Sequence, residues 1–285
     1  MIRSLTRLRS MLGAARLAAR RRRFTRGLLH GQGLEIGALH APFPVPNGVS
    51  VSYVDRLSTP ELRHHYPELA ALPLVPVDRI DDGERLRTVE SASQDFVIAS
   101  HVLEHCEDPI GAIGHWLRVV RTDGVVILAV PDARHSFDRG RPITALDHLL
   151  RDASEGPEGS RSAHYREWVH HVEGRTGPDA HARAARLERD RYSIHFHVWD
   201  VAALRELLHH CAERGPTPST MLKIEHHRGE NLAALRRSKR TEALRRSKRT
   251  EALRRSERTE ALRRSERTEA LRRSERTEAL RRSER

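Results

Sequence analysis

Cysteine is one of the rarest residues in this chain, with only Cys106 and Cys211 among 285 residues. Two cysteines so far apart do not indicate a disulfide framework, and we expect a reducing, cytoplasmic setting. Long apolar runs are also missing, since no stretch approaches the roughly 18 residues that a membrane-spanning helix requires. These absences argue against a small disulfide-stapled fold and against an integral helical membrane protein.

Acidic residues are absent from the first 30 residues, which contain nine arginines. Residues 235–285 carry 20 basic and nine acidic side chains, and the whole chain has a net charge of +12. The central residues 31–234 are therefore acidic, with a net charge of −8. A basic chain often binds nucleic acid or an anionic membrane. Here such partners could be contacted only through the two ends, because the central part has the opposite charge.

The N-terminal segment 1–30 has apolar side chains at Ile2, Leu5, Leu8 and Leu12, close to one face of a helix. Its arginines interrupt this pattern too often for the apolar region of a secretory signal. We expect a basic helix that packs against the edge of the next domain. A membrane-surface helix and a targeting segment are the alternatives. The expected location is therefore the cytoplasm, with binding to the membrane surface as the alternative.

The C-terminal segment 238–285 continues a nine-residue repeat, "LRRSKRTEA" and later "LRRSERTEA". At about 100° per residue, nine residues advance 900°, so successive leucines lie on opposite helix faces. This period excludes the continuous apolar stripe of a coiled coil. We expect an exposed charged helix or a disordered tail, with non-specific binding to polyanions as its functional alternative.

The central segment 31–237 alternates short apolar runs with amphipathic segments. This alternation predicts a doubly wound, Rossmann-like α/β sheet. The sheet is expected to be mostly parallel and to end in an antiparallel hairpin. Strands are expected at 33–37, 49–57, 72–78, 95–100 and 124–132, helices at 59–69, 108–121 and 200–215, and the hairpin at 221–237.

Residues 133–194 exceed what a minimal five-strand core needs. We expect them to form a helical insertion after the fifth strand that covers the cleft and binds the acceptor. Tyr165 and Trp168 are scarce aromatic residues within it, in a chain with only 4% of them. Either they stack on a sugar or apolar acceptor, or they attach the insertion to the sheet.

The loop after the first strand decides which cofactor is plausible. Dinucleotide sites use G-x-G-x-x-G so that the backbone can approach a pyrophosphate. After Gly37 this chain has Ala38, Leu39 and His40, and three prolines from Pro42 onward oppose a long helix. A carboxylate at the end of the second strand, Asp55, suits ribose hydroxyls. The pattern favours a cofactor with ribose and adenine but without phosphate, such as S-adenosylmethionine.

Four segments, "LEIGALHAPF", "YVDRLS", "DFVIASHVLEHCEDP" and "VILAVPD", resemble successive motifs of class I S-adenosylmethionine-dependent methyltransferases of types 11 and 23. The resemblance covers about residues 31–236. It implies that Glu35 and Gly37 line the methionine end of the cofactor and that Asp55 binds the ribose. It also implies that Asp78 lies near the adenine and that Ser100 and His101 border the sulfonium. The neighbouring residues Ile36, Ala38 and Arg56 complete the set of cofactor-binding candidates.

Histidine is the usual base for removing a proton from a hydroxyl acceptor. The catalytic candidates are His101, His105 and His135, with Asp132 to orient one of them, and His101 is preferred. His195 and His197 are two residues apart, so in a strand they lie on the same face, and this arrangement does not require a ligand. We expect no metal site, because His101 and His105 lack a further ligand at a recognised spacing, although Cys106 and Asp108 lie nearby.

The sequence therefore predicts methyl transfer from S-adenosylmethionine to a small-molecule or glycan-linked acceptor, with a hydroxyl as the receiving group. The alternative is a non-catalytic Rossmann-like scaffold that uses its basic ends to bind nucleic acid or an anionic membrane surface.

Overall fold

The computed structural model describes residues 2–69, 71–227 and 229–239, with the backbone alone for 2–12. The predicted helical or disordered tail lies, from residue 240 onward, outside the described residues. Residues 1–239 form one compact unit. No helix in the described part is long and apolar enough to cross a membrane.

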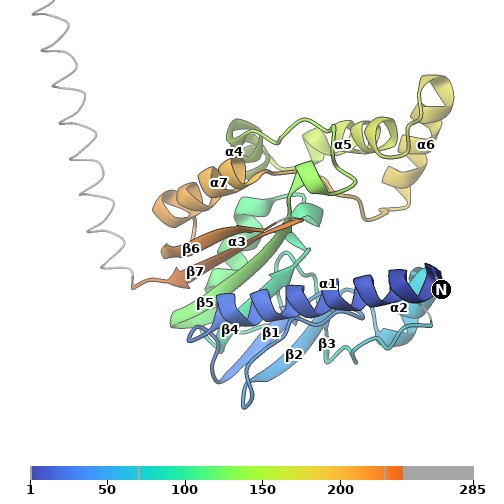
Figure 1. Cartoon of the computed structure of the whole chain (residues 1–285). Helices are drawn as coiled ribbons and strands as arrows, with labels where there is room; N and C mark the ends of the chain where they lie inside the picture. Colours follow the sequence, from blue (N-terminus) through green and yellow to red (C-terminus); the bar gives the residue numbers. More distant parts are fainter. Residues whose placement is uncertain (1, 70, 228, 240–285) are drawn as a thin grey trace, which may run out of the picture. The chain divides into compact units, whose positions relative to one another are not determined.

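A single sheet of seven strands forms the centre of the described chain, in the order β3-β2-β1-β4-β5-β7-β6 (Figure 1). Neighbouring strands pair in parallel except that β7 is antiparallel to both β5 and β6. The predicted mostly parallel sheet with an antiparallel end hairpin is thereby confirmed. The strands are β1 (Gln32–Ile36), β2 (Ser50–Asp55), β3 (Arg79–Ile80), β4 (Gln94–Ser100), β5 (Val120–Pro131), β6 (Ser219–His227) and β7 (Glu230–Arg237).

The third strand differs from the prediction, because residues 72–78 are not a strand and β3 follows them. Pro73 and Pro76 lie within the predicted run, and neither has a backbone N–H to donate to a ladder. The segment instead makes isolated backbone hydrogen bonds, from Val75 N–H to the Leu39 carbonyl and from Asp78 N–H to the Tyr53 carbonyl. Only Leu74 of this run is buried, and the segment lies beside the sheet edge without joining the sheet.

Two predicted helices are shorter than expected. Helix α2 (Thr59–His65) ends before Pro67, because a residue that precedes proline avoids the helical conformation. A short 3₁₀ turn, η1 (Pro67–Leu69), follows. Helix α3 (Pro109–Val119) begins as predicted, with Asp108 accepting a hydrogen bond from Gly111 N–H at 2.9 Å, but β5 starts directly after it. The Asp123-Gly124 pair therefore lies inside β5 and does not end the helix.

Hydrophobic side chains cover both faces of the sheet, as in other doubly wound folds. On one face α3 and α7 (Val201–Arg214) pack through Trp116, Leu204 and Leu208. On the other face the C-terminal end of α1 (Ile2–Thr25) contributes Phe24, which packs with Phe43. The proline-containing segment between β1 and β2 is not helical, as its sequence predicts.

The region after β5 forms the expected helical insertion. It consists of η3 (Ala133–His135), α4 (Leu146–Glu155), α5 (Glu158–His171) and α6 (Gly177–Arg189), followed by an extended segment that leads to α7. The insertion has a small core of its own, in which Tyr165, Val169 and Leu187 are buried with Ile194 and Phe196. Tyr165 donates a hydrogen bond to the Tyr192 carbonyl at 2.9 Å, so this aromatic residue ties α5 to the extended segment.

Candidate active site

A cavity of about 580 Å³ opens at the carboxyl ends of β1, β2 and β4. Its size lies within the roughly 300–1,000 Å³ of small-ligand pockets. The sheet supplies one side of it and the insertion the other. The sheet side includes Ile36, Gly37, Leu39, Asp55, Arg56, Asp82, Gly83, Glu84, His101, Val102, His105, Cys106 and Glu107. The residues that follow α2 add Tyr66, Glu68 and Leu69. The insertion side contributes Tyr165, Arg191, Tyr192, Ser193 and Phe196.

Five of the predicted cofactor residues line this cavity: Ile36, Gly37, Asp55, Arg56 and His101. Gly37 has a φ of +64°, a conformation that favours glycine, and this turns the chain away from β1. Its N–H donates to the Val54 carbonyl at 2.9 Å, which holds the ends of β1 and β2 together. The single glycine of this loop is thus needed for the turn itself.

Four other predicted cofactor residues, Glu35, Ala38, Asp78 and Ser100, do not line the cavity. Glu35 alternates with Leu34 and Ile36 along β1 and so faces the opposite side of the sheet. Its Oε1 accepts a hydrogen bond from Phe43 N–H at 2.8 Å, and Oε2 is buried without a partner. Burial raises the pKa of Glu35 to about 7, although the Phe43 hydrogen bond opposes the shift.

The resemblance assigned Asp78 to the adenine end of the site, but acidic residues in the turn after β3 line the cavity. Asp78 accepts a hydrogen bond from Tyr53 N–H at 2.8 Å, whereas Asp82 and Glu84 line the cavity. Asp81 shapes this turn by accepting backbone hydrogen bonds, including one from Thr88 N–H at 2.8 Å. The motif "DDGE" at residues 81–84 contains the acidic residues of this turn that reach the cavity. The sequence prediction chose Asp78 because it placed the third strand at 72–78, before the position of β3.

Carboxylates predominate over cations in the cavity. Asp55, Glu68, Asp82, Glu84 and Glu107 line it, against Arg56, Arg191 and His101, although burial raises the pKa of Glu84 to about 7. This charge opposes a pyrophosphate and is complementary to a cationic sulfonium nucleoside. Asp55 also lies at the end of β2, where its carboxylate can accept hydrogen bonds from ribose hydroxyls. The residues present therefore fit S-adenosylmethionine better than a dinucleotide.

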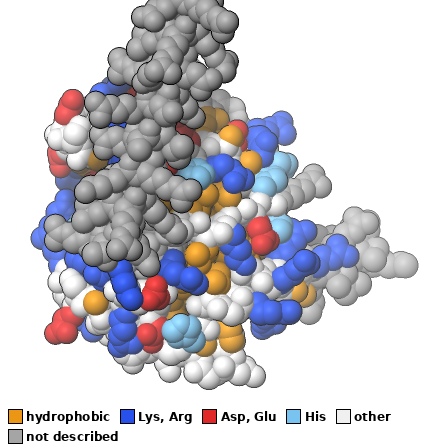
Figure 2. Space-filling model, turned by 90° about the vertical axis from the view of Figure 1, so that its left-hand side faces the viewer, with side chains coloured by type: hydrophobic (Ala, Val, Ile, Leu, Met, Phe, Trp, Pro, Cys, Tyr) orange, Lys and Arg blue, Asp and Glu red, His pale blue; other side chains and the backbone are white. Residues whose placement is uncertain are grey.

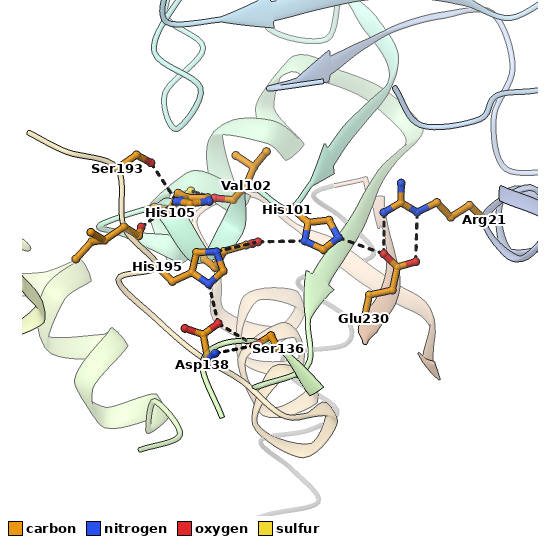
Figure 3. A network of polar contacts seen from close by, with 12 residues as sticks. Arg21, His101, Val102, His105, Ser136, Asp138, Ser193, His195 and Glu230 are labelled. Carbon is orange, nitrogen blue, oxygen red and sulfur yellow. Dashed lines mark hydrogen bonds and ion pairs between the residues drawn. The ribbon is translucent and has the colours of Figure 1, made fainter. Parts of the chain in front are cut away.

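His101 lies between two carboxylates at the mouth of β4 (Figure 3). Its Nε2 is 3.3 Å from Glu230, and its Nδ1 is 3.5 Å from the buried Glu104. Burial lowers the pKa of His101, but the hydrogen bonds to the two carboxylates outweigh it and raise the pKa to about 9. The ring is therefore protonated at neutral pH, and a protonated imidazole cannot accept a proton from an acceptor.

His105 has the opposite character, although it is only four residues away. Its Nδ1 lies 2.8 Å from the Ile194 carbonyl, which can only accept, so Nδ1 carries the proton. The second ring nitrogen, Nε2, is then the acceptor atom of a neutral imidazole. Burial lowers the pKa of His105, and Glu104 only partly opposes this shift. A neutral imidazole of fixed tautomer in the cavity wall can serve as a general base.

The other predicted catalytic pair, Asp132 and His135, lies beside a separate surface hollow of about 440 Å³. Arg134 binds both oxygens of Asp132, at 2.9 and 2.6 Å, and His226 of β6 lies 3.2 Å from the same carboxylate. The structure therefore brings His101 and His105 together in the cavity wall and groups Asp132 with His135 and His226 outside it.

A chain of polar contacts runs through His101 and joins the sheet to the insertion (Figure 3). On one side, Arg21 of α1 binds Glu230 at 2.7 Å. On the other side, His195 lies 4.0 Å from Glu104 and 2.7 Å from Asp138. These contacts connect four segments that are distant in the sequence, so no local spacing could have indicated them.

A family described as a methyltransferase domain matches residues 15–211. Among solved structures, a Rhodobacter sphaeroides protein described as a Zn-dependent alcohol dehydrogenase is 19% identical, over 76% of this chain and 88% of that chain, with a TM-score of 0.47. A SAM-dependent methyltransferase from Aquifex aeolicus is 10% identical, over 73% of this chain and 84% of that chain, with a TM-score of 0.40. A SAM-dependent methyltransferase from Thermotoga maritima is 14% identical, over 84% of this chain and 100% of that chain, with a TM-score of 0.39. None of the curated proteins matches the chain.

Proposed function

Because this chain belongs to the methyltransferase-domain family and uses S-adenosylmethionine, we propose that it methylates a hydroxyl of a small-molecule or glycan-linked acceptor. The observation that carries the proposal is the hydrogen bond between His105 and the Ile194 carbonyl, which leaves a basic ring nitrogen in the cavity wall. Thiols and neutral ring nitrogens need such a base less than a hydroxyl does, because they are better nucleophiles near neutral pH.

The insertion supplies the acceptor side of the site in this proposal. Arg191, Tyr192 and Ser193 follow α6 and line the same cavity as Gly37 and Asp55. An acceptor of modest size could lie between these two sets of residues, and the insertion would exclude water from the transfer. A cavity of about 580 Å³ that also holds the cofactor leaves room for a monosaccharide or a single ring better than for a folded macromolecule.

S-adenosylmethionine supplies a methyl group on a positively charged sulfur, and its transfer to oxygen leaves S-adenosylhomocysteine. Asp55 would accept hydrogen bonds from the ribose hydroxyls, and Asp82 would lie at the adenine end of the cofactor. His105 would take the proton of the acceptor hydroxyl at Nε2 when that oxygen receives the methyl group. His101 stays protonated and holds Glu104 and Glu230 in their charged forms. Positioning of the acceptor provides much of the rate enhancement.

Calorimetric titration tests the cofactor site first, with S-adenosylmethionine, S-adenosylhomocysteine and a NAD control. We expect micromolar binding of the first two and a loss of tenfold or more, about 1.4 kcal/mol, in Asp55→Ala. Asp179→Ala on α6 is the matched control, because its side chain is exposed and does not line the cavity. Absence of binding by the folded wild-type chain would favour the non-catalytic scaffold.

A labelled-methyl transfer assay then tests the acceptor. Sugars and phenols with free hydroxyls are compared with matched amines and thiols, using methyl-labelled S-adenosylmethionine. Label on oxygen that depends on His105 supports the proposal, whereas transfer to nitrogen or sulfur alone would overturn the hydroxyl assignment.

A cytoplasmic location and polyanion contacts through the basic ends are further parts of the proposal. On the face shown in Figure 2, Lys and Arg side chains are interspersed with hydrophobic, acidic and histidine side chains. The positive charge of residues 1–30, with nine arginines, and of residues 235–285, with 20 basic and nine acidic side chains, supports contacts made by the two ends.

A further inference from the structure

Three histidines and one aspartate meet inside the insertion, away from the cofactor cavity. His148 and Asp152 lie one turn apart on α4, His164 lies on α5, and His197 lies in the extended segment before α7. One ligand atom from each of the four lies within 4.8 Å of all the others. Asp152, His164 and His197 are buried, and His148 is 27% exposed. None of the four lines the cavity described above.

We propose that His148, Asp152, His164 and His197 bind a divalent metal ion of the zinc class in a closed, tetrahedral, structural site. Tetrahedral Zn²⁺ with ligands at 2.0–2.1 Å places neighbouring ligand atoms about 3.3 Å apart. The Nε2 atoms of His148 and His164 are 3.0 Å apart, and His148 Nε2 is 3.2 Å from Asp152 Oδ2. Four protein ligands leave no open position, which is typical of structural sites.

The hydrogen bonding of His197 presents a lone pair to the cluster. Its Nε2 lies 3.3 Å from the Glu107 carbonyl, so Nε2 carries the proton. Its Nδ1 is then unprotonated, and it is buried without a hydrogen-bond partner. Metal-binding histidines commonly have the second nitrogen held by a carbonyl in this way. Asp152 Oδ2 is likewise buried without a hydrogen bond, and its close neighbour is His148.

The cluster brings three imidazoles together with one carboxylate, Asp152, and one imidazole nitrogen and one carboxylate oxygen in it are buried without a hydrogen-bond partner. The nearby Arg141 is engaged elsewhere, because it binds Asp138 at 2.8 Å and Glu167 at 3.0 Å.

Two other groups of potential ligands in the described residues are weaker candidates. Glu104, His105 and His195 belong to the wall and support of the cofactor cavity. Asp132, His135 and His226 include two exposed histidines, and Arg134 already neutralises the carboxylate. The donor set of three imidazoles and one carboxylate favours Zn²⁺ over Mg²⁺ or Ca²⁺, which prefer oxygen ligands.

A metal ion here would fasten three segments that otherwise share only a small core. It would join α4 and α5 to the residues around His197. The neighbouring Phe196 lines the cavity and donates its N–H to the Glu104 carbonyl at 2.8 Å. Ile194, three residues before His197, orients His105. The ion would therefore hold in place the segment that shapes the acceptor side, without contacting the reactants.

Metal analysis of the full, untagged chain tests the site independently of methyl transfer. We expect about one zinc per chain after purification without chelator. After treatment with EDTA, the melting temperature should fall and should be restored by added Zn²⁺. Co²⁺ in place of Zn²⁺ should give the strong visible absorption of a tetrahedral ion.

Matched variants locate the ion. Asp152→Asn and His148→Gln should lower the zinc content at least fivefold, and the folded state is checked by circular dichroism. Asp147→Asn and His170→Ala are exposed neighbours on the same helices and should retain the metal. His226→Ala should also retain it, which excludes the group around Asp132.

Two results would overturn the proposal. One is a folded wild-type chain that contains no zinc and neither binds nor is stabilised by micromolar Zn²⁺ or Co²⁺. The other is zinc binding that Asp152→Asn and His148→Gln leave unchanged. Neither result depends on an acceptor or on S-adenosylmethionine, so failure of the metal site and failure of the proposed function are distinguishable.

Discussion

The Nδ1 atom of His105 lies 2.8 Å from the backbone carbonyl of Ile194, which connects the end of β4 to the segment after α6. The two residues are separated by 89 positions in the sequence. This contact assigns the proton to Nδ1 and leaves Nε2 basic, so the insertion determines the chemical state of a residue on the sheet.

Replacing His105 by alanine should lower kcat by about 10²–10⁴-fold if His105 is the general base. Binding of S-adenosylmethionine should change little, because other residues hold the cofactor. In the wild type, kcat should rise with pH through a midpoint below 6.5, since burial lowers the pKa of His105 from that value. His64→Ala, an exposed histidine on α2, is the control. A kcat within threefold of wild type would mean that positioning alone drives the transfer.

Asp82 and Asp78 should differ in their effect on cofactor affinity. Asp82 lines the cavity, whereas Asp78 is bonded to Tyr53 N–H. We expect Asp82→Asn to weaken S-adenosylmethionine binding about tenfold, about 1.4 kcal/mol, and Asp78→Asn to change it less than twofold. Calorimetry measures both. A larger loss of affinity in Asp78→Asn than in Asp82→Asn would assign the adenine end of the site to Asp78.

Removal of Arg21 should strongly destabilise the domain. Its guanidinium and the Glu230 carboxylate are both buried, and breaking such a pair costs about 3–5 kcal/mol, of which the remaining contact of Glu230 with His101 at 3.3 Å offsets a part. Urea unfolding of Arg21→Ala should show a loss of this order. The adjacent Arg22→Ala should lose less than about 0.5 kcal/mol, because Arg22 is exposed. Equal effects of the two variants would show that α1 is not anchored through Glu230.

Glu35 should make stability depend on pH. Its native pKa of about 7 exceeds the usual 4.5, so between these values the native state binds more protons than the unfolded state. The stability contributed by protonated Glu35 is fully present below pH 4.5 and is lost as pH rises through 7. Glu35→Gln cannot ionise and keeps an acceptor for Phe43 N–H. From pH 5 to pH 8, its stability relative to wild type should increase by about 1–3 kcal/mol.

Urea unfolding of Glu35→Gln at the two pH values checks this expectation, with the exposed Glu90→Gln as control. A difference between variant and wild type that stays constant with pH would contradict the shifted pKa.

Truncation after Lys239 should preserve cofactor binding. The sheet is complete at Arg237, and Ser238 N–H donates to the Pro218 carbonyl at 2.9 Å. We therefore expect an S-adenosylmethionine affinity within twofold of the full chain by calorimetry. A tenfold loss would instead assign the repeat tail a role in the site.

Local sequence patterns were sufficient for much of the fold. The apolar runs of β1 and β4, the Asp108 cap of α3 and the hairpin of β6 and β7 are all encoded by neighbouring residues. The prolines after Gly37 correctly predicted the absence of a helix between β1 and β2. The third strand was misplaced because an apolar run with two prolines resembles a strand in composition but lacks the N–H groups for pairing.

The charge states of the histidines depended on tertiary contacts. His101 and His105 are four residues apart and chemically identical in the sequence. One is protonated because Glu104 and Glu230 flank it, and the other is neutral because it is buried against the Ile194 carbonyl. Sequence reasoning preferred His101 as the base, since it had no access to a partner on β7 or to the proton position on His105.

The sequence by itself determined the order of strands and helices and the class of cofactor, because periodicity, turn residues and the missing glycines act over a few neighbouring positions. Only the tertiary structure decided which acids reach the cavity, which histidine is basic, and that His148, Asp152, His164 and His197 meet. These features require side chains from separate elements to come within a few ångströms. Their burial and partners, which set charge and reactivity, exist only once the chain has folded.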